Sequence, residues 1–148
     1  RACRFTGHEW LLEIITARAG QPPQFDSVAS IMKHFYQLKV KPDWWKLEPG
    51  TDADYWQKLG SLIDDFDPNC QGMIVLGLDG SIESIAESFK FAAAQPSVKG
   101  FAVGRTIFSQ TAQDWLAGRI DGKTAVATMR GNYRRLINAW DTAKTVSI

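Results

Sequence analysis

Residues 41–79 read KPDWWKLEPGTDADYWQKLGSLIDDFDPNCQGMIVLGLD, and this stretch decides the fold. It begins and ends with short apolar runs, residues 43–47 and 73–78, whose branched and aromatic side chains are typical of β-strands. Between the two runs, residues 51–66 place apolar side chains at three- and four-residue spacing, the period of an amphipathic helix. Asp-Pro-Asn at 67–69 then ends the helix. The stretch therefore predicts one strand–helix–strand unit.

The same pattern extends outward from this unit in both directions. Two further strand-like runs flank it, at residues 9–15 and 101–103. Four further helical patterns cover residues 25–38, 81–94, 111–120 and 123–144. The strand centres fall about 30 residues apart, the length of one strand–helix unit with short loops. Strict alternation of this kind predicts an α/β protein with a parallel sheet and helical crossovers.

Two parallel architectures compete, the closed (β/α)8 or TIM barrel and the open doubly wound sheet. An open nucleotide-binding sheet is expected to carry a G-x-G-x-x-G loop after its first strand, but residues 16–24 read TARAGQPPQ. The barrel is therefore favoured. At 148 residues the chain is shorter than the roughly 250 residues of a whole barrel. We predict that residues 1–148 form its C-terminal half, closed by the last helix.

Composition excludes several classes of function. Hydrophobic residues make up 45% of the chain and the net charge is +1, so neither nucleic acid nor a membrane is expected as a partner. No apolar run reaches the 18 residues of a membrane span. Cys3, Cys70, His8 and His34 show no metal-ligand spacing, so we expect free thiols, no metal and no cofactor. These features are typical of a cytoplasmic metabolic protein.

Lys46 interrupts an apolar run, where a solvated surface lysine is out of place. Period-two alternation places Lys46 on one face of the strand with Trp44 and Glu48, and puts Trp45 and Leu47 on the other. A lysine that points into a crowded interior is desolvated, which favours the neutral amine. Such an amine forms Schiff bases with carbonyl groups. The alternative is an edge-strand lysine whose ammonium group reaches solvent past the tryptophans.

Glu13 lies within the apolar sequence LLEII of the first strand. A carboxylate there needs a charged partner or a shift towards its neutral acid form. Glu13 is therefore a candidate general acid–base beside an amine nucleophile, or a member of a structural salt bridge, for example with Lys46 itself. The two interpretations do not exclude each other. Glu48, which shares the face of Lys46, is also expected among the residues that contact substrate.

The last two strands both end in glycine-bearing turns. Gly77 is followed by Asp79 and a further glycine, and Gly104 is followed directly by Arg105. Glycine lets backbone N–H groups approach an anion, and arginine supplies a charged fork for phosphate. Barrels often bind phosphate in the loops after their last two strands. These four residues predict a phosphate site. The alternative is two ordinary turns in which Arg105 pairs with Asp79.

Together these stretches resemble a known family. The most specific are residues 41–49 (KPDWWKLEP) and 99–108 (KGFAVGRTIF), accompanied by Leu-Glu-Ile at 12–14 and Gly-Leu-Asp at 77–79. Over essentially its whole length the chain resembles the aldolase-like domain at the C-terminus of bacterial myo-inositol catabolism proteins. In those proteins the domain follows a sugar kinase that phosphorylates 2-deoxy-5-keto-gluconate. The domain is in turn similar to class I tagatose-bisphosphate aldolases.

The resemblance implies that the four strands are the fifth to eighth of a barrel. It implies that Lys46 is the Schiff-base lysine, that Glu13 is the acid–base, and that Gly77, Gly104 and Arg105 hold phosphate. The implied reaction cleaves 2-deoxy-5-keto-gluconate 6-phosphate to dihydroxyacetone phosphate and malonate semialdehyde. Gly-Leu-Asp replaces a serine-containing turn of the tagatose-bisphosphate group, so the contacts to the sugar hydroxyls stay open.

Other functions also fit the sequence. The chain can be a non-catalytic phosphosugar-binding domain that regulates an attached sugar kinase, or an aldolase of the tagatose-bisphosphate type. A nucleotide-binding open sheet fits least well. Half a barrel leaves two open sheet edges. We therefore expect either four preceding strands or a second copy of the chain, and hence a homo-oligomer, to complete it.

Overall fold

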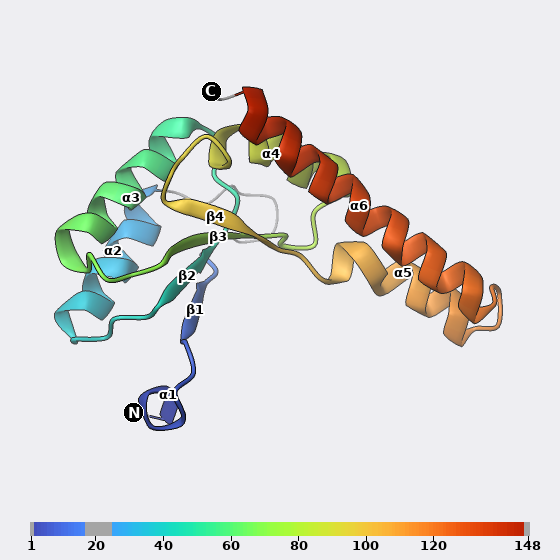
Figure 1. Cartoon of the computed structure of the whole chain (residues 1–148), viewed down its shortest axis with the longest axis horizontal. Coiled ribbons are helices and arrows are strands. Elements are labelled where there is room, and N and C mark those ends of the chain that lie inside the picture. The colour runs from blue at the N-terminus through green and yellow to red at the C-terminus, as the bar shows by residue number, and fades with distance from the viewer. Residues whose placement is uncertain (1, 17–24, 147–148) are drawn as a thin grey trace.

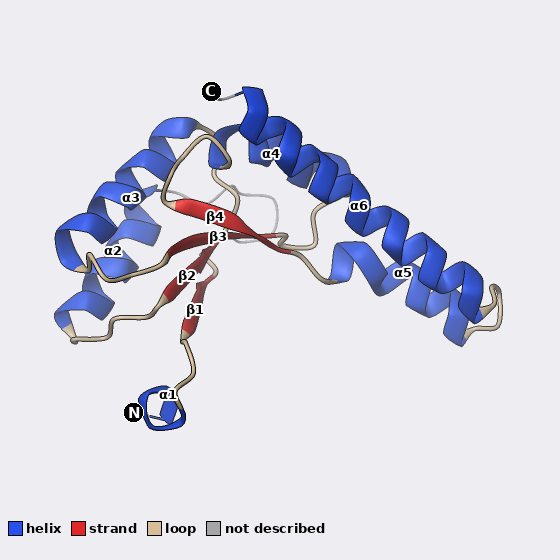
Figure 2. Ribbon diagram, in the orientation of Figure 1, coloured by secondary structure: helices blue, strands red, loops and turns tan. Residues whose placement is uncertain are grey.

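The computed structural model describes residues 2–16 and 25–146, which form a sheet flanked by helices (Figures 1 and 2). The strands are β1 (Leu11–Ile14), β2 (Trp44–Leu47), β3 (Gly72–Leu76) and β4 (Val98–Ala102). The helices are α1 (Ala2–Thr6), α2 (Phe25–Gln37), α3 (Ala53–Phe66), α4 (Ile82–Ala92), α5 (Arg105–Leu116) and α6 (Gly122–Val146). Strand and helix alternate from β1 to α5, so the predicted α/β class is confirmed. Residues 17–24, most of the loop searched for a glycine motif, lie outside the described residues.

All three strand pairings are parallel, and the sheet order is β1-β2-β3-β4. Glu13 is the register partner of Lys46, and Lys46 is the partner of Ile74. Crossovers between parallel strands are right-handed. When successive crossovers advance in one direction along the sheet, they therefore place their helices on the same face. The reversal of order that puts helices on both faces of a doubly wound sheet is absent from these four strands.

One face of the sheet is covered by helices, as Figures 1 and 2 show for α2, α3, α4 and α6. The strands contribute six buried side chains to this core, from Ile14, Trp45, Leu47, Met73, Val75 and Val98. The helices bury apolar side chains in the same cluster, among them Met32, Trp56, Leu59, Phe89, Leu136 and Trp140. Burial of this apolar surface is the main stabilising contribution to the fold.

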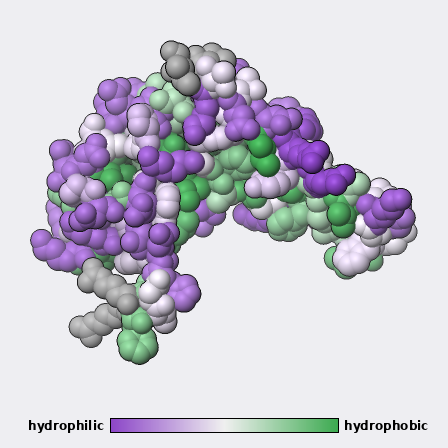
Figure 3. Space-filling model, in the orientation of Figure 1, coloured by the Kyte–Doolittle hydropathy of each residue, from purple (hydrophilic) through white to green (hydrophobic). Residues whose placement is uncertain are grey.

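No described helix covers the opposite face of the sheet. Leu11 is 41% exposed there, and Glu13 and Ala102 are also exposed. Lys46 and Ile74 are half-buried. The space-filling view in Figure 3 shows polar surface over the outside of the helices and apolar surface along the concave margin beneath them. Parallel sheets normally have both faces covered. In the described residues only one face is covered, and the other is bare.

Two elements begin well before their predicted positions, and one helix was not predicted. The strand predicted at residues 101–103 begins earlier, at Val98, because backbone pairing with β3 extends it through a polar stretch with an irregular register. The helix predicted at 111–120 begins at Arg105 and ends before Gly118, whose φ of +70° suits glycine at a helix C-terminus. Helix α1 was not predicted at all, since five residues are too short for a periodic pattern.

Helices α5 and α6 form an arm that projects from one side of the molecule in Figure 1. They pack against each other, and the Asn132 side chain donates to the Ile107 carbonyl at 3.0 Å. Apolar side chains along the arm are left exposed, including Leu116 (77%) and Val126 (67%). Over the described part of the chain, the helices are too short or too polar to span a bilayer.

Candidate functional site

A cavity of about 280 Å³ lies at the carboxyl ends of the strands. Parallel-sheet proteins build their active sites at this edge because the loops after neighbouring strands converge there. The cavity collects six of the seven residues singled out from the sequence, namely Glu13, Lys46, Gly77, Asp79, Gly104 and Arg105. They come from four different strand ends, so only the folded sheet brings them together.

Lys46 and Glu13 form one side of the cavity. They are register partners on β2 and β1, so their side chains leave the sheet on the same, bare face. Lys46 Nζ lies 3.2 Å from Glu13 Oε1, and the two side chains are 21% and 39% exposed. The salt bridge anticipated from the sequence is present, and an amine and a carboxyl group stand within reach of one bound substrate.

The turn after β3 forms a second side. Leu78 and Asp79 have φ values of 44° and 57°, the left-handed region that non-glycine residues rarely occupy. The Gly80 N–H donates to the Gly77 carbonyl at 2.8 Å and closes the turn. A Cβ on Gly77 would lie 2.9 Å from a methyl group of Val103, so a larger residue would force Val103 to move. Strained turns of this kind persist where neighbouring structure holds them, and they concentrate at functional sites.

The amino end of α5 forms the third side, and it is tied to the β3 turn. Arg105 Nη1 lies 2.7 Å from Asp79 Oδ2, and the Thr106 hydroxyl donates to the Gly80 carbonyl at 2.7 Å. Gly104 is the N-cap and supplies no side-chain capping bond. Gly104, Arg105 and Thr106 line the cavity, so the N-terminus of α5 lies at it together with a guanidinium group. Helix N-termini are favourable places for phosphate. The ordinary Arg105–Asp79 pairing foreseen as an alternative is present as well.

Glu48 is the one predicted site residue that does not line the cavity. Its side chain is fully buried, and Oε2 accepts hydrogen bonds from the Thr16 N–H at 2.8 Å and the Thr16 hydroxyl at 2.7 Å. The Tyr55 hydroxyl approaches the Glu48 carbonyl oxygen at 3.5 Å. Burial, with a further contribution from the charge of Glu48, raises the pKa of Tyr55.

Two residues of the site escaped the sequence reasoning. Thr106 holds the β3 turn to α5, and Phe108, 44% exposed, lines the cavity one helical turn beyond Gly104. Their only signal is their place in the phrase that follows Gly104 and Arg105, at the start of a helix whose predicted boundary was too late. Placing that boundary at Arg105 would have found both residues.

The cysteines lie outside the cavity. Cys70 is partly buried and its thiol donates to the Asp43 carbonyl at 3.4 Å; burial raises the pKa of Cys70. A raised pKa makes the thiolate scarcer at neutral pH and the thiol less nucleophilic. Across residues 2–16 and 25–146, no three His, Cys, Asp or Glu side chains are grouped closely enough to hold a metal ion.

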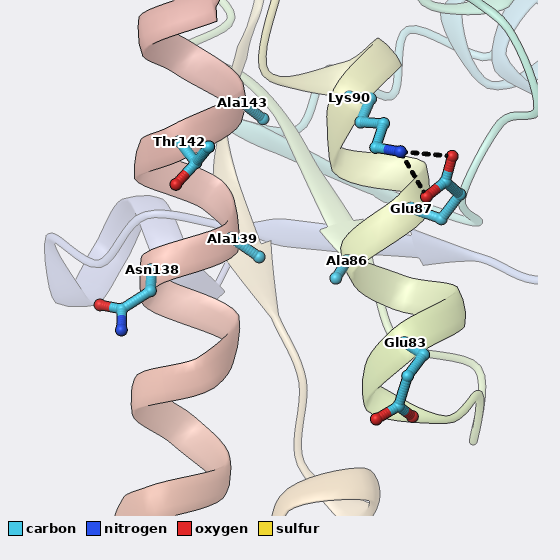
Figure 4. A pocket seen from close by; sticks show the side chains of 8 residues that line it. All are labelled: Glu83, Ala86, Glu87, Lys90, Asn138, Ala139, Thr142 and Ala143. Carbon is cyan, nitrogen blue, oxygen red and sulfur yellow. Dashed lines mark hydrogen bonds and ion pairs between the residues drawn. The ribbon is translucent and has the colours of Figure 1, made fainter.

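A larger groove of about 490 Å³ lies between α4 and α6 and shares no lining residue with the strand-end cavity (Figure 4). Its floor is formed by small side chains from both helices, Ala86, Ala139 and Ala143. In Figure 4 Asn138 and Thr142 point away from it, and Lys90 turns to Glu87, to which it is salt-bridged at 2.6 Å. Polar groups do not converge in this groove, so the strand-end cavity is the candidate active site.

Fold and cavity define an α/β protein with a parallel sheet and, at the carboxyl ends of its strands, a cavity lined by a lysine, an arginine and two carboxylates. A family model described as "Uncharacterized protein conserved in bacteria (DUF2090)" matches residues 1–144, and the chain belongs to this family. The family assignment is compatible with the resemblance to aldolase-like domains but does not specify it. Comparison with curated proteins found no match.

Proposed function

We propose that this chain carries the active site of a class I aldolase that cleaves a phosphorylated keto sugar acid through a Schiff base on Lys46. The observation that carries the proposal is the 3.2 Å separation of Lys46 Nζ and Glu13 Oε1 at the carboxyl ends of adjacent parallel strands. A lysine amine is the nucleophile of Schiff-base chemistry, and a carboxyl group beside it can carry the protons. The resemblance points to the same two positions.

In the proposed reaction the Lys46 amine attacks the substrate ketone, and Glu13 protonates the departing hydroxyl as the carbinolamine loses water. The resulting iminium accepts the electron pair of the carbon–carbon bond as it breaks, while Glu13, now a carboxylate, removes the proton of the β-hydroxyl. Protonation of the enamine and hydrolysis then free the lysine. With 2-deoxy-5-keto-gluconate 6-phosphate, the products are malonate semialdehyde and dihydroxyacetone phosphate.

The phosphate of the substrate is proposed to bind opposite the lysine. Arg105 supplies the charged fork, and the N–H groups around Gly104 and the glycine turn at Gly77 supply backbone donors. Asp79 already pairs with Arg105 across the cavity rim, so a bound phosphate would share or displace this carboxylate. Asp79 is placed to accept a hydrogen bond from a substrate hydroxyl instead.

We further propose that the four strands are the fifth to eighth of a TIM barrel. Support comes from their sequential order and from the helices gathered on one face, which leave the other face bare. The edges at β1 and β4 would pair with four further strands, from another part of a longer chain or from a second copy. Slow amide exchange along the outer edge of β4 in the native protein is expected; fast exchange there would contradict barrel closure.

A second function is favoured by one specific observation. The two cationic side chains that the described residues bring to the cavity are already paired with carboxylates, Lys46 with Glu13 and Arg105 with Asp79. A cavity of this kind also suits a phosphosugar-binding domain that regulates an attached kinase without turnover. An aldolase for tagatose bisphosphate is the nearest catalytic alternative, and a substrate panel separates the two aldolase activities.

Borohydride trapping tests the proposal. The native protein is incubated with dihydroxyacetone phosphate, reduced with borohydride and examined by peptide mass spectrometry. We expect a stable adduct on Lys46. Lys46→Arg is the matched control, because it keeps a cation beside Glu13 but cannot form the Schiff base. If dihydroxyacetone phosphate binds but forms no adduct, the aldolase proposal is wrong, and the phosphosugar-binding domain becomes the better interpretation.

A further inference from the structure

Glu48 is a buried acid that the proposed chemistry does not use. Its side chain is fully shielded from solvent, and burying a carboxylate is costly unless hydrogen bonds or charges compensate it. Two of its hydrogen bonds come from one residue, Thr16, through the backbone N–H and the hydroxyl. Both bonds end on the same oxygen, Oε2, and both are short, at 2.8 and 2.7 Å.

The contact between Glu48 and Thr16 lies where the pairing of β1 with β2 ends. The ladder between β1 and β2 ends at the pair Ile14↔Leu47. Glu48 is the next residue after β2, and Thr16 is the second residue after β1. The contact therefore continues the attachment of the first strand to the second beyond the last ladder pair. β1 has only four residues and pairs with β2 alone in the described sheet, so its carboxyl end has few other restraints.

Glu48 is itself held firmly. Asp52 caps α3 by accepting the Tyr55 N–H at 2.8 Å, which fixes the Tyr55 ring beneath the loop after β2. The ring fills the space where a side chain on Gly50 would lie, and its hydroxyl approaches the Glu48 carbonyl. These contacts tie the segment from Glu48 to the start of α3, and Thr16 is hydrogen-bonded to it.

We propose that Glu48 is a positioning residue, which holds the end of β1 through Thr16 so that Glu13 stays within proton-transfer reach of Lys46. The inference rests on the proposed aldolase function. Glu13 lies three residues before Thr16 and directly opposite Lys46 in the register. Releasing Thr16 would let the end of β1 move away from β2, and displacements of about 1 Å can cost about 100-fold in rate.

Two substitutions test this role from both sides of the contact. Glu48→Gln keeps the size of the side chain but removes its charge, and Thr16→Val removes only the hydroxyl donor. We expect each to lower kcat by about 10- to 100-fold. KM and the affinity for inorganic phosphate should change little, because the Arg105 end of the cavity is untouched. Thr16→Ser, which keeps the hydroxyl, should restore most of kcat.

Asp67→Asn is the matched control, since Asp67 is also a buried carboxylate but pairs with Lys41, 3.7 Å away, at the end of α3. It should leave kcat unchanged, and the double variant Thr16→Val/Glu48→Gln should be no slower than the slower single variant. Wild-type kcat in both single variants, or an equal loss of kcat in Asp67→Asn, would overturn the positioning role of Glu48 and leave the aldolase proposal standing. No Lys46 adduct in the wild-type protein would overturn the aldolase proposal and this role with it.

Discussion

The two faces of the sheet have opposite characters, although they alternate residue by residue along the same strands. On β2, Trp45 is fully buried against the helices, while its neighbour Lys46 lies on the bare face. On β1, Ile14 is buried and Glu13 is exposed. The covered face is apolar and supplies stability, and the bare face carries the ion pair and the proposed chemistry. Stability and activity should therefore respond separately to substitutions one position apart.

On the bare face, Lys46→Met is expected to have the largest effect. Removal of the nucleophile should lower turnover by at least about 1000-fold, because Lys46 is the one amine among the described residues that line the cavity. The melting temperature should stay close to that of the wild type, since the side chain contributes little to the core. Turnover is measured in a coupled assay for dihydroxyacetone phosphate. Retained activity would contradict the assignment of Lys46.

On the covered face, Trp45→Ala is expected to lower stability. Trp45 packs edge-on against Tyr36 and donates its indole N–H to the Tyr36 hydroxyl at 2.8 Å. Truncation should lower the free energy of unfolding by about 3–5 kcal/mol, measured by urea denaturation. Trp44→Ala is the matched control on the other face, where the half-buried indole donates to Glu9. It should cost only about 1 kcal/mol, and equal losses would show that the faces do not differ.

Arg105→Ala tests whether phosphate binding and catalysis depend on different ends of the cavity. Loss of the guanidinium group should weaken binding of dihydroxyacetone phosphate about 10- to 100-fold, the effect of a hydrogen bond to a charged group. Asp79→Asn should leave this affinity unchanged or increase it, because it removes a carboxylate that competes for Arg105. Titration calorimetry measures both. Weaker binding of dihydroxyacetone phosphate to Asp79→Asn would show that Asp79 contributes to binding and does not compete with the phosphate for Arg105.

The smallest expected effect is a loss of stability at alkaline pH, which arises from a buried tyrosine. Burial raises the pKa of Tyr55 in the folded state, so above about pH 10 the unfolded chain loses a phenol proton that the folded chain keeps. The stability is complete below that pH and falls above it, by about 1.4 kcal/mol per pH unit for each such tyrosine. Tyr55→Phe should make the fall shallower. Urea denaturation between pH 9 and 11 measures it; an identical slope would contradict the burial effect.

Much of the fold could be predicted because it depends on local pattern. Apolar spacing along residues 41–79 predicted β2, α3 and β3, and all three are present. The pattern misplaced the starts of β4 and α5. Val98 and Lys99 become strand only because β3 lies beside them, and α5 begins at Arg105, before the periodic pattern at 111–120. Pairing with a distant segment leaves no periodic signal in the sequence itself.

The candidate site divides in the same way. The sequence determined which residues are chemically unusual, because a lysine or glutamate inside an apolar strand is costly and therefore conspicuous. It also determined that Lys46 and Trp45 face opposite sides, since alternation is a property of the strand. Only the tertiary structure decided that Glu13 stands opposite Lys46 in the register. It alone placed Glu48 in the interior with Thr16 instead of in the cavity, because both contacts depend on how separate strands align.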